Sequence, residues 1–267
     1  MTLDKIRPKT IVINYETIVN NKNFHNRFVK LLNIGYNKPR FRYGVIETPR
    51  IKKGIINDLQ IDSKNLDKNY AFITYLPYKL NDTTETIIET EEELNDFCSE
   101  SKDCKKYTER LIDNQPVGSL DYSDFETDYI IGNEAIIELE NLIIKDLKKF
   151  EENFLGTVSI KNINTENEPL KYEVTAFVSF YPKLGGKLMS LMEIFTSNVL
   201  NIKKMHLDVI LEHDLQDYYE SLGYKLVDTI ILKVDPVSHK LIADDAPLEG
   251  GIMASQDFSI GIMIKDI

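Results

Sequence analysis

The order of elements between residues 171 and 229 constrains the fold of this chain more than any other feature. The run 171–180 reads Lys-Tyr-Glu-Val-Thr-Ala-Phe-Val-Ser-Phe and is rich in the β-branched and aromatic residues that favour strands. Two glycines follow it, and apolar residues then recur at helical spacing. The expected elements are a strand over 171–180, a helix through Val199, a strand over 205–211, a short helix ending at Gly223 and a strand from Tyr224. This stretch predicts a strand–turn–helix–strand unit around which the other segments are arranged.

The glycine pair Gly185-Gly186 is a candidate binding turn. Glycine lets a backbone turn tightly and approach a ligand without a side chain in the way. The first turn of the following helix has N–H groups without intrahelical partners, and the helix dipole adds positive charge there, so a phosphate is favoured. A P-loop is excluded, because Tyr181 and Leu188 stand where it has Gly and Ser or Thr, and the G-x-G-x-x-G pattern is absent as well. From the glycines alone, a plain β–α turn without a ligand is an equal alternative.

Residues 180–227 resemble the central part of the GNAT superfamily of acyl-CoA N-acyltransferases. The short helix of that family ends in Tyr-Glu-x-Leu-Gly-Phe, and this chain reads Tyr-Glu-Ser-Leu-Gly-Tyr over 219–224. The family's turn reads Arg/Gln-x-x-Gly-x-Gly/Ala, and here it is Lys183-Leu-Gly-Gly-Lys-Leu188. Gly186 matches the first family glycine, whereas Lys183 and Leu188 differ from the pattern. Near the position of a family Asn, this chain has Glu212-His213.

The resemblance implies a mixed α/β (α+β) fold. In that fold a central seven-stranded, mostly antiparallel sheet is flanked by helices and splayed between two parallel strands, which here end at Phe180 and Leu211. Open α/β sheets bind ligands at the carboxyl ends of their strands, so we expect acetyl-CoA in this gap. Backbone at Val178 and Phe180 is expected to pair with the pantetheine arm, and the amides of 185–189 to hold the pyrophosphate. The expected cofactor-binding residues are Val178, Phe180, Lys183, Gly185, Gly186, Lys187, Leu188, Met189 and His213.

The resemblance also assigns catalytic roles. Tyr219 is expected to protonate the thiolate leaving group, which a phenol of pKa about 10 can do for a thiol of pKa about 8.5 only if the site tunes both groups. Tyr219 is also suited to packing the short helix on the sheet. Glu173 is the first choice for the general base that deprotonates the amine, and Glu212, His206 and His213 are the other candidates.

Composition limits the partners. The net charge is −11 and the isoelectric point is near 5.0, which argues against nucleic acid or an anionic membrane as a main partner. No apolar run is long enough to span a bilayer, and the N-terminus has no signal-peptide core. Cys98 and Cys104 are the two cysteines, which favours a cytoplasmic location, with the nucleus not excluded. No His, Cys or Asp spacing matches a metal site.

The remaining segments are consistent with one domain over 1–267. The expected elements are strands over 10–14, 70–76, 154–160 and 257–264, and helices over 21–36, 50–59 and 133–153, with 154–160 paired to 171–180 as a hairpin. Gly35 is a plausible cap for the helix over 21–36. Arg40-Phe-Arg42 is expected in a solvated loop between two prolines, with a ligand clamp as the alternative. The segment at about 80–130 is read as an acidic insertion, with a substrate lid as the functional alternative.

The sequence therefore predicts an N-acetyltransferase that moves acetyl from acetyl-CoA to a primary amine, in a small molecule or a peptide, by direct attack in a ternary complex. The acidic loop with Asp244, Asp245 and Glu249 is a candidate contact for a cationic amine. Two alternatives stay open. One is a non-catalytic module of the same fold that binds a ligand or a protein, and the other is an unrelated α/β binding protein.

Overall fold

The computed structural model describes residues 8–76, 111–112, 115–116, 128–132, 134–139, 153–163, 171–181, 183–242 and 252–267. Its centre is one eight-stranded mixed sheet in the order β5-β1-β2-β6-β7-β8-β10-β9. The strands of this sheet are β1 (Lys9–Asn14), β2 (Tyr70–Tyr75), β5 (Asp128–Ile131), β6 (Phe154–Asn162), β7 (Tyr172–Ser179), β8 (Lys204–Ile210), β9 (Lys225–Leu232) and β10 (Phe258–Asp266). A separate two-stranded ladder joins β3 (Leu111–Ile112) to β4 (Gln115–Pro116).

The mixed α/β fold class is confirmed. Within the sheet, β1–β5 and β7–β8 are parallel and the other neighbouring pairs are antiparallel. The expected hairpin of β6 and β7 is present. The sheet has one strand more than the seven expected, because β5 joins its edge beside β1.

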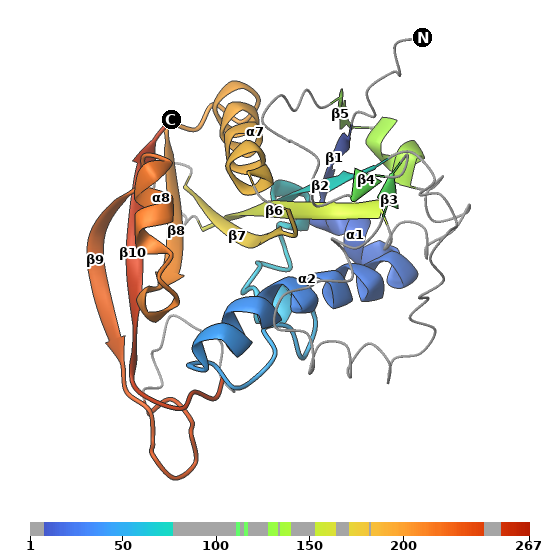
Figure 1. Cartoon of the computed structure of the whole chain (residues 1–267). Coiled ribbons are helices and arrows are strands. Elements are labelled where there is room, and N and C mark those ends of the chain that lie inside the picture. The colour runs from blue at the N-terminus through green and yellow to red at the C-terminus, as the bar shows by residue number, and fades with distance from the viewer. Residues whose placement is uncertain are drawn as a thin grey trace.

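Helices cover both faces of the sheet. Figure 1 shows α7 above strands β6 and β7 and α2 below them, so the two long helices lie on opposite faces. The helices are α1 (Tyr15–Asn20), α2 (Lys22–Tyr43), α3 (Ile55–Asp58), α7 (Leu184–Asn198) and α8 (Gln216–Ser221), with 3-10 turns η1 (Leu66–Lys68) and η3 (Leu211–His213). Residues 134–139 of the helix expected over 133–153 are helical, and its remainder lies outside the described residues.

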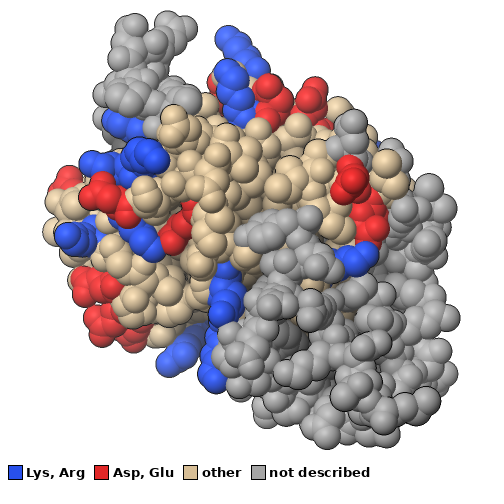
Figure 2. Space-filling view, turned by 90° about the horizontal axis from the view of Figure 1, so that it is seen from above, with Lys and Arg blue, Asp and Glu red and all other residues tan. Residues whose placement is uncertain are grey.

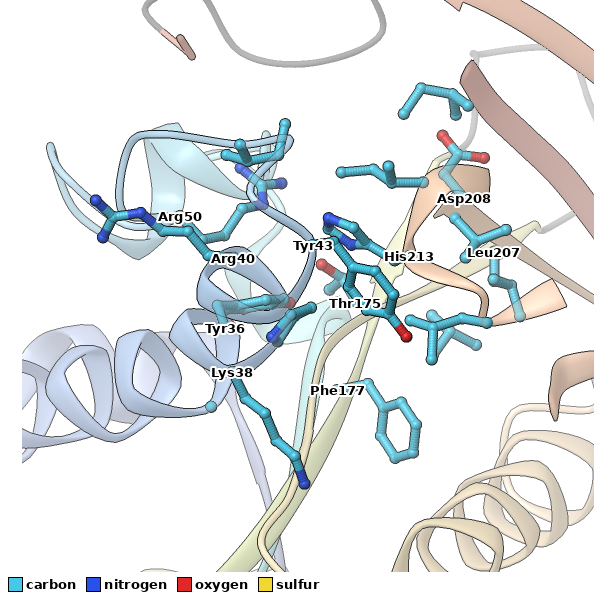
Figure 3. Close-up of a pocket in the computed structure, with 18 of the residues that line it drawn as sticks. Tyr36, Lys38, Arg40, Tyr43, Arg50, Thr175, Phe177, Leu207, Asp208 and His213 are labelled. Atoms are coloured by element: carbon cyan, nitrogen blue, oxygen red, sulfur yellow. The ribbon is translucent and has the colours of Figure 1, made fainter. Parts of the chain in front are cut away.

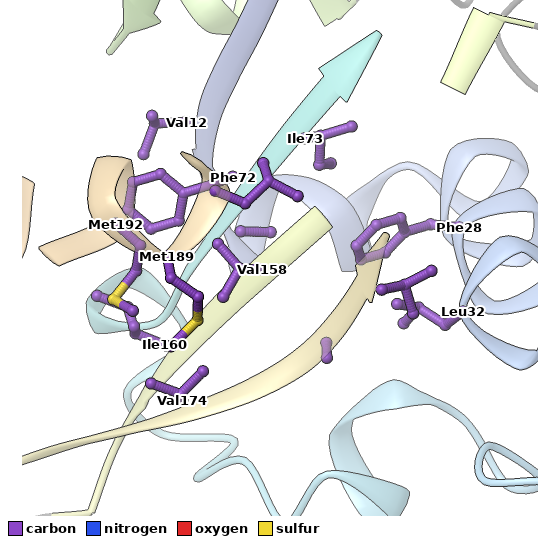
Figure 4. Close-up of a cluster of buried hydrophobic side chains, with 14 of the residues drawn as sticks. Val12, Phe28, Leu32, Phe72, Ile73, Val158, Ile160, Val174, Met189 and Met192 are labelled. Carbon is purple, nitrogen blue, oxygen red and sulfur yellow. The ribbon is translucent and has the colours of Figure 1, made fainter. Parts of the chain in front are cut away.

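The core has two layers, one on each side of the sheet. Met189 and Met192 of α7 pack near Phe72 on one face, while Phe28 and Leu32 of α2 lie on the other face (Figure 4). Strands β2 and β6 are buried along nearly their whole length, as expected for central strands that are covered on both faces. Burial of this apolar area is what fixes the register of the central strands.

Helix α2 is longer than the sequence predicts. It continues through Pro39 to Tyr43 and ends at Gly44, which has the left-handed φ of 69°. The prediction that Gly35 caps the helix was therefore wrong. Gly35 lies where α2 crosses β7, and a Cβ there would lie 2.2 Å from Cγ1 of Val178. Glycine is needed at this position because the two elements approach closely.

Two other expectations also change. Arg40-Phe-Arg42 is helical rather than a solvated loop. The helix expected over 50–59 is reduced to the four residues of α3, because Asp58 folds back on the segment before it. Its Oδ2 accepts the backbone N–H groups of Lys52, Lys53 and Gly54 at 2.5, 2.6 and 3.0 Å.

Most of the acidic insertion at about 80–130, with Cys98 and Cys104, lies outside the described residues, as do Asp244, Asp245 and Glu249. The arrangement of the chain as one domain with an insertion stays a prediction. In the described part of the chain, every helix is too short or too polar to cross a membrane. Seen from above, where α7 lies in Figure 1, the surface is uncharged over a broad central area, and charges of both signs gather towards one side (Figure 2).

Candidate functional site

The parallel strands β7 and β8 pair over only part of their length. Three residue pairs join them, Tyr172 with Met205, Glu173 with His206, and Val174 with Leu207. Beyond these pairs, β7 continues to Ser179 and β8 to Ile210 without pairing with each other. The sheet is therefore open at the carboxyl ends of its two central parallel strands, as the fold prediction requires.

A β-bulge in β7 accounts for this opening. Thr157 of β6 pairs with Val178, whereas Ser159 pairs with Thr175, so two residues of β7 lie opposite Val158 alone. Of these two, Ala176 has a φ of 45°, which costs a non-glycine residue about 1–2 kcal/mol. Bulges bend the strand that carries the extra residue. The bend directs the end of β7 away from β8.

A cavity of about 450 Å³ occupies the gap. Phe177 and Ser179 line it from β7, and both also lie beside Gly185 at the start of α7. Figure 3 shows Tyr36, Lys38, Arg40 and Arg50 on one side of the cavity and Leu207, Asp208 and His213 on the other. The cavity thus extends from the α2 side of the sheet to residues that contact the first turn of α7.

The turn before α7 differs from the predicted glycine corner. Lys183 makes it, with a φ of 64°, and Gly185 and Gly186 lie inside the first turn of the helix. A Cβ on Gly185 would lie 2.7 Å from the hydroxyl of Tyr218, so glycine is required there by close packing. Gly186 is less confined, since the atom nearest to a Cβ there is Cδ2 of Leu222 at 3.7 Å.

The other predicted cofactor residues occupy two kinds of position. Val178, Leu188 and Met189 are buried with their side chains in the core. Phe180 packs its ring on Phe154, with centroids 5.6 Å apart, and donates its N–H to the carbonyl of Leu155 at 3.1 Å. That N–H is therefore engaged in the sheet. Lys187 lies in the first turn of α7. Its predicted contact with the cofactor is made by its backbone N–H and does not involve its side chain.

Tyr219 lies in the wall of the cavity. Its side chain is 8% exposed and contacts Tyr218 edge-on, with ring centroids 5.3 Å apart. Burial raises the pKa of Tyr219 above its usual range, and the neighbouring phenols of Tyr218 and Tyr36 add to the rise. The phenol therefore stays protonated at every physiological pH, as a proton donor must, although it is a weak acid.

Two carboxyl groups line the cavity. Glu173 is held by Lys161, whose Nζ lies 2.9 Å from its Oε1 and also donates to the carbonyl of Leu59 at 3.2 Å. Asp208 retains contact with solvent, yet partial burial raises its pKa to about 6, with Glu173 adding to the rise and Lys161 opposing it. Asp208 is therefore ionised at neutral pH, and it binds a proton more tightly than an ordinary aspartate does, as a general base must.

The other candidate bases are placed differently. His213 is buried in the cavity wall, its ring stacks on Tyr43 with centroids 5.4 Å apart, and burial lowers its pKa. Its Nε2 has no hydrogen-bond partner among the described residues. His206 is outside the cavity lining, and Glu212 accepts the backbone N–H of Ser259 at 2.9 Å.

Tyr219, Glu173 and His213 line one cavity in the structure, and their roles stay a prediction. The structure adds residues that sequence reasoning missed. The additions with the clearest chemistry are Tyr36, Lys38, Arg40, Arg42, Arg50 and Asp208. Lys38, Arg40 and Arg42 were missed because the helix was expected to end at Tyr36 with Gly35 as its cap, which hid its continuation into the cavity wall. Within the described ranges, no group of His, Cys, Asp and Glu side chains has metal-binding geometry.

Solved structures similar to this chain include acetyltransferases. A probable acetyltransferase from Staphylococcus epidermidis is 10% identical, with a TM-score of 0.45, and the match covers 97% of this chain and 98% of that one. An N-acetyltransferase from Staphylococcus aureus is 9% identical, with a TM-score of 0.39, and covers 97% of each chain.

The family described as "Sporulation protein RMD6" matches residues 1–267, and the chain belongs to that family. A curated relative, the sporulation protein RMD6 of Saccharomyces cerevisiae, is 27% identical over 239 residues. That match covers 88% of this chain and 85% of the relative. Neither description states an enzymatic activity.

Proposed function

We propose that this chain is an acyl-CoA-dependent N-acyltransferase that moves acetyl from acetyl-CoA to a primary amine. The observation that carries the proposal is the bulged gap between β7 and β8, which connects the first turn of α7 to a cavity with an acid and a base. Open sheets bind ligands at such carboxyl ends, and a helix start favours phosphate. The acceptor is a small amine or a peptide amine, and the cytoplasm is the compartment that the sequence favours.

The proposed cofactor site begins at α7. The backbone amides of Gly185, Gly186, Lys187, Leu188 and Met189 hold the pyrophosphate, with Lys183 and His213 beside the cofactor. The unpaired edge of β7 near Val178 and Phe180 runs along the pantetheine arm. When bound there, acetyl-CoA supplies an activated acetyl group on a good leaving group, and the protein orients the thioester towards the cavity.

The proposed reaction is a direct transfer. The amine nitrogen attacks the thioester carbonyl, a C–N bond forms, and the C–S bond breaks. The departing sulfur takes a proton from Tyr219, and the nitrogen loses a proton to a carboxylate. Glu173 and Asp208 are the two candidates for the carboxylate that accepts this proton. Glu173 forms an ion pair with Lys161, whereas the pKa of Asp208 is raised to about 6. General acid and base groups of this kind each contribute about 10²–10⁴-fold to rate.

A non-catalytic binding module remains a second candidate because of one observation. Tyr218 and Phe177 lie against Gly185 and cover part of the helix start. A ligand that enters the gap has to displace these side chains or pass beside them. Such a module binds acetyl-CoA or a related ligand and releases no thiol.

The test combines binding with turnover. Calorimetry with acetyl-CoA measures binding, and release of free thiol is followed over a panel of amines with wild type and Tyr219→Phe. The expected result is micromolar to millimolar binding, thiol release with at least one amine, and a kcat lowered about 10²-fold or more in Tyr219→Phe.

Tyr70→Phe is the matched control, because it removes one phenol hydroxyl on β2, outside the cavity lining, and is expected to leave kcat unchanged. Binding without thiol release from any amine would reject the enzyme in favour of the binding module. Absence of acetyl-CoA binding would reject both.

A further inference from the structure

Tyr36 reaches the β-bulge of β7 from α2. Gly35 precedes it in the helix, and a Cβ on Gly35 would lie 2.2 Å from Cγ1 of Val178, so the backbone of α2 lies directly against β7 at this point. Tyr36 lines the cavity, and Figure 3 shows its side chain directed from α2 towards the strand that carries Thr175 and Phe177. The close approach of helix and strand therefore brings a phenol to the place where the sheet opens.

The bulge supplies backbone N–H groups to this phenol. Ala176 and Phe177 of β7 lie opposite Val158 alone, and a bulge of this kind leaves its extra residue out of the hydrogen-bond ladder of the strands. The backbone N–H groups of both bulge residues act on the Tyr36 hydroxyl as hydrogen-bond donors. The phenol oxygen is thus the acceptor in these contacts, and its own proton is left to donate to another group.

Charged groups act on the same hydroxyl. Burial raises the pKa of Tyr36, Arg50 and the two bulge amides oppose the rise, and Glu173 adds to it. The phenol is therefore neutral at physiological pH and keeps its proton. Hydrogen bonds that a hydroxyl oxygen accepts polarise the O–H bond and make the hydroxyl a stronger donor. Tyr36 is therefore suited to donate a hydrogen bond to an oxygen on which negative charge develops.

Tyr36 and Tyr219 share one cavity. Both line it, and the Tyr36 phenol is close enough to add to the rise in the pKa of Tyr219. Tyr219 already has a proposed role, which is to protonate the departing sulfur. In a thioester the sulfur and the carbonyl oxygen are bonded to the same carbon atom. A phenol near the acid for the sulfur is therefore well placed for the oxygen.

We propose that Tyr36 is a further catalytic residue of the acetyl transfer and donates a hydrogen bond from its hydroxyl to the thioester carbonyl oxygen. When the amine nitrogen bonds to the carbonyl carbon, the π electrons of the carbonyl move to this oxygen, and the hydrogen bond stabilises the charge that forms there. When the C–S bond breaks, the electron pair returns to the carbonyl, and Tyr36 keeps its proton. The catalytic role rests on the proposed function, but the contact with the carbonyl can be measured without turnover.

The first measurement is the infrared frequency of the carbonyl of isotope-labelled acetyl-CoA bound to the full chain. A hydrogen bond to a carbonyl oxygen weakens the C=O bond and lowers its stretching frequency. We expect a lower frequency with wild type than with Tyr36→Phe, and a still lower one when difluorotyrosine, a more acidic phenol, replaces Tyr36. Tyr36→Phe should also weaken binding of acetyl-CoA about threefold to tenfold, and should leave unchanged the binding of the thioether S-ethyl-CoA, which has no carbonyl.

The second measurement is thiol release with the amine that the panel identifies. Tyr36→Phe should lower kcat about 10²-fold or more, as loss of an oxyanion donor does, whereas the difluorotyrosine variant should remain active. Tyr70→Phe removes a phenol hydroxyl outside the cavity lining and should change neither the carbonyl frequency nor kcat. Urea denaturation of each variant is measured alongside, because a purely structural role of Tyr36 would lower stability without moving the frequency.

The outcomes separate the two proposals. If wild type and Tyr36→Phe give the same carbonyl frequency and the same preference for acetyl-CoA over S-ethyl-CoA, the hydrogen bond is rejected. Acetylation by Tyr36→Phe at the kcat of wild type rejects the catalytic role and leaves the acetyltransferase intact. If the frequency depends on Tyr36 but no amine is acetylated, the hydrogen bond stands and the acetyltransferase fails. Failure of acetyl-CoA to bind rejects both.

Discussion

At the scale of single residues, the site depends on side chains whose surroundings change their chemistry. Asp208 is the clearest case, because it shares the cavity with Glu173 but lacks the ion pair that Glu173 makes with Lys161. Burial acts in the same direction on the tyrosines, since it raises the pKa of Tyr218 to about 12 and keeps its phenol neutral. The cavity thus holds neutral phenols that can donate a proton and a carboxylate that can accept one.

Asp208 yields a prediction on pH. If it takes the amine proton, kcat/KM of the wild type rises as the pH increases through about 6, where Asp208 loses its own proton. Asp208→Asn should lower kcat and remove this limb of the pH profile, whereas Asp228→Asn on β9 should not. A profile that keeps its limb near pH 6 in Asp208→Asn assigns the base to another group.

Stability gives a second measurement on Asp208. Its pKa is raised from 3.8 to about 6 in the folded chain, so the folded state holds the proton more tightly than the unfolded state. The free energy of unfolding therefore falls as pH rises from about 4 to about 6. Urea titrations at pH 4 and pH 7 should show a smaller fall for Asp208→Asn than for wild type. An equal fall in both proteins contradicts the raised pKa.

At the scale of elements, the sequence predicted the strands and helices that have a long, regular pattern. Strands β1, β2 and β7, the hairpin with β6, and helix α7 were all expected close to their observed bounds. The end of α2 was not expected where it lies, because Gly35 was taken as the cap, whereas the helix continues through Pro39 to its left-handed cap at Gly44. The bulge at Ala176 was not predictable, since it arises from pairing with β6 and leaves no signal in the local sequence.

Two glycines in helices make a matched pair for a stability test. Gly35→Ala should destabilise the chain by about 1–3 kcal/mol, because its Cβ would lie 2.2 Å from the branched side chain of Val178. Gly186→Ala should be neutral or stabilising by up to about 1 kcal/mol, because its surroundings are open and alanine favours a helix.

Urea denaturation measures both effects. Adding Val178→Ala to Gly35→Ala should recover part of the loss, since the smaller side chain makes room for the new methyl group. Equal stability of Gly35→Ala and wild type would mean that α2 and β7 do not approach as closely as described.

At the scale of the whole molecule, the sheet is two blocks, β5-β1-β2-β6-β7 and β8-β10-β9, joined by the three residue pairs of β7 and β8, and apart from the edge pair β1–β5 the strands within each block are antiparallel. The resemblance of residues 180–227 to the GNAT superfamily predicted such a gap, and Tyr219 lies in the lining of the cavity there. The basic residues that line the cavity from α2 and the loop after it, and Asp208, were not predicted. The basic residues lie within 38–50, whereas Asp208 is far from them in the sequence and meets them only after α2 crosses the sheet, so no local spacing reveals the arrangement.

Hydrogen exchange tests this division of the sheet. Amides of 175–179 and 208–210 that face the gap should exchange faster than those of β2 and β6, because they lack a partner strand. Addition of acetyl-CoA should slow them selectively if the cofactor occupies the gap. Slow exchange in the free protein, equal to that of β6, would show that the gap is closed in solution.

The contact between Gly35 and Val178 has a mechanical consequence. At this contact the side chain of Val178 packs directly against the backbone of α2. Val178 lies just beyond the bulge that opens the sheet, and Gly35 lies about one turn before the part of α2 that lines the cavity. A shift of the β7 end is therefore transmitted directly to Lys38, Arg40 and Arg42. Occupation of one end of the gap is thus expected to change the affinity of the other end, and because such coupling is reciprocal, each ligand should alter binding of the other by the same factor.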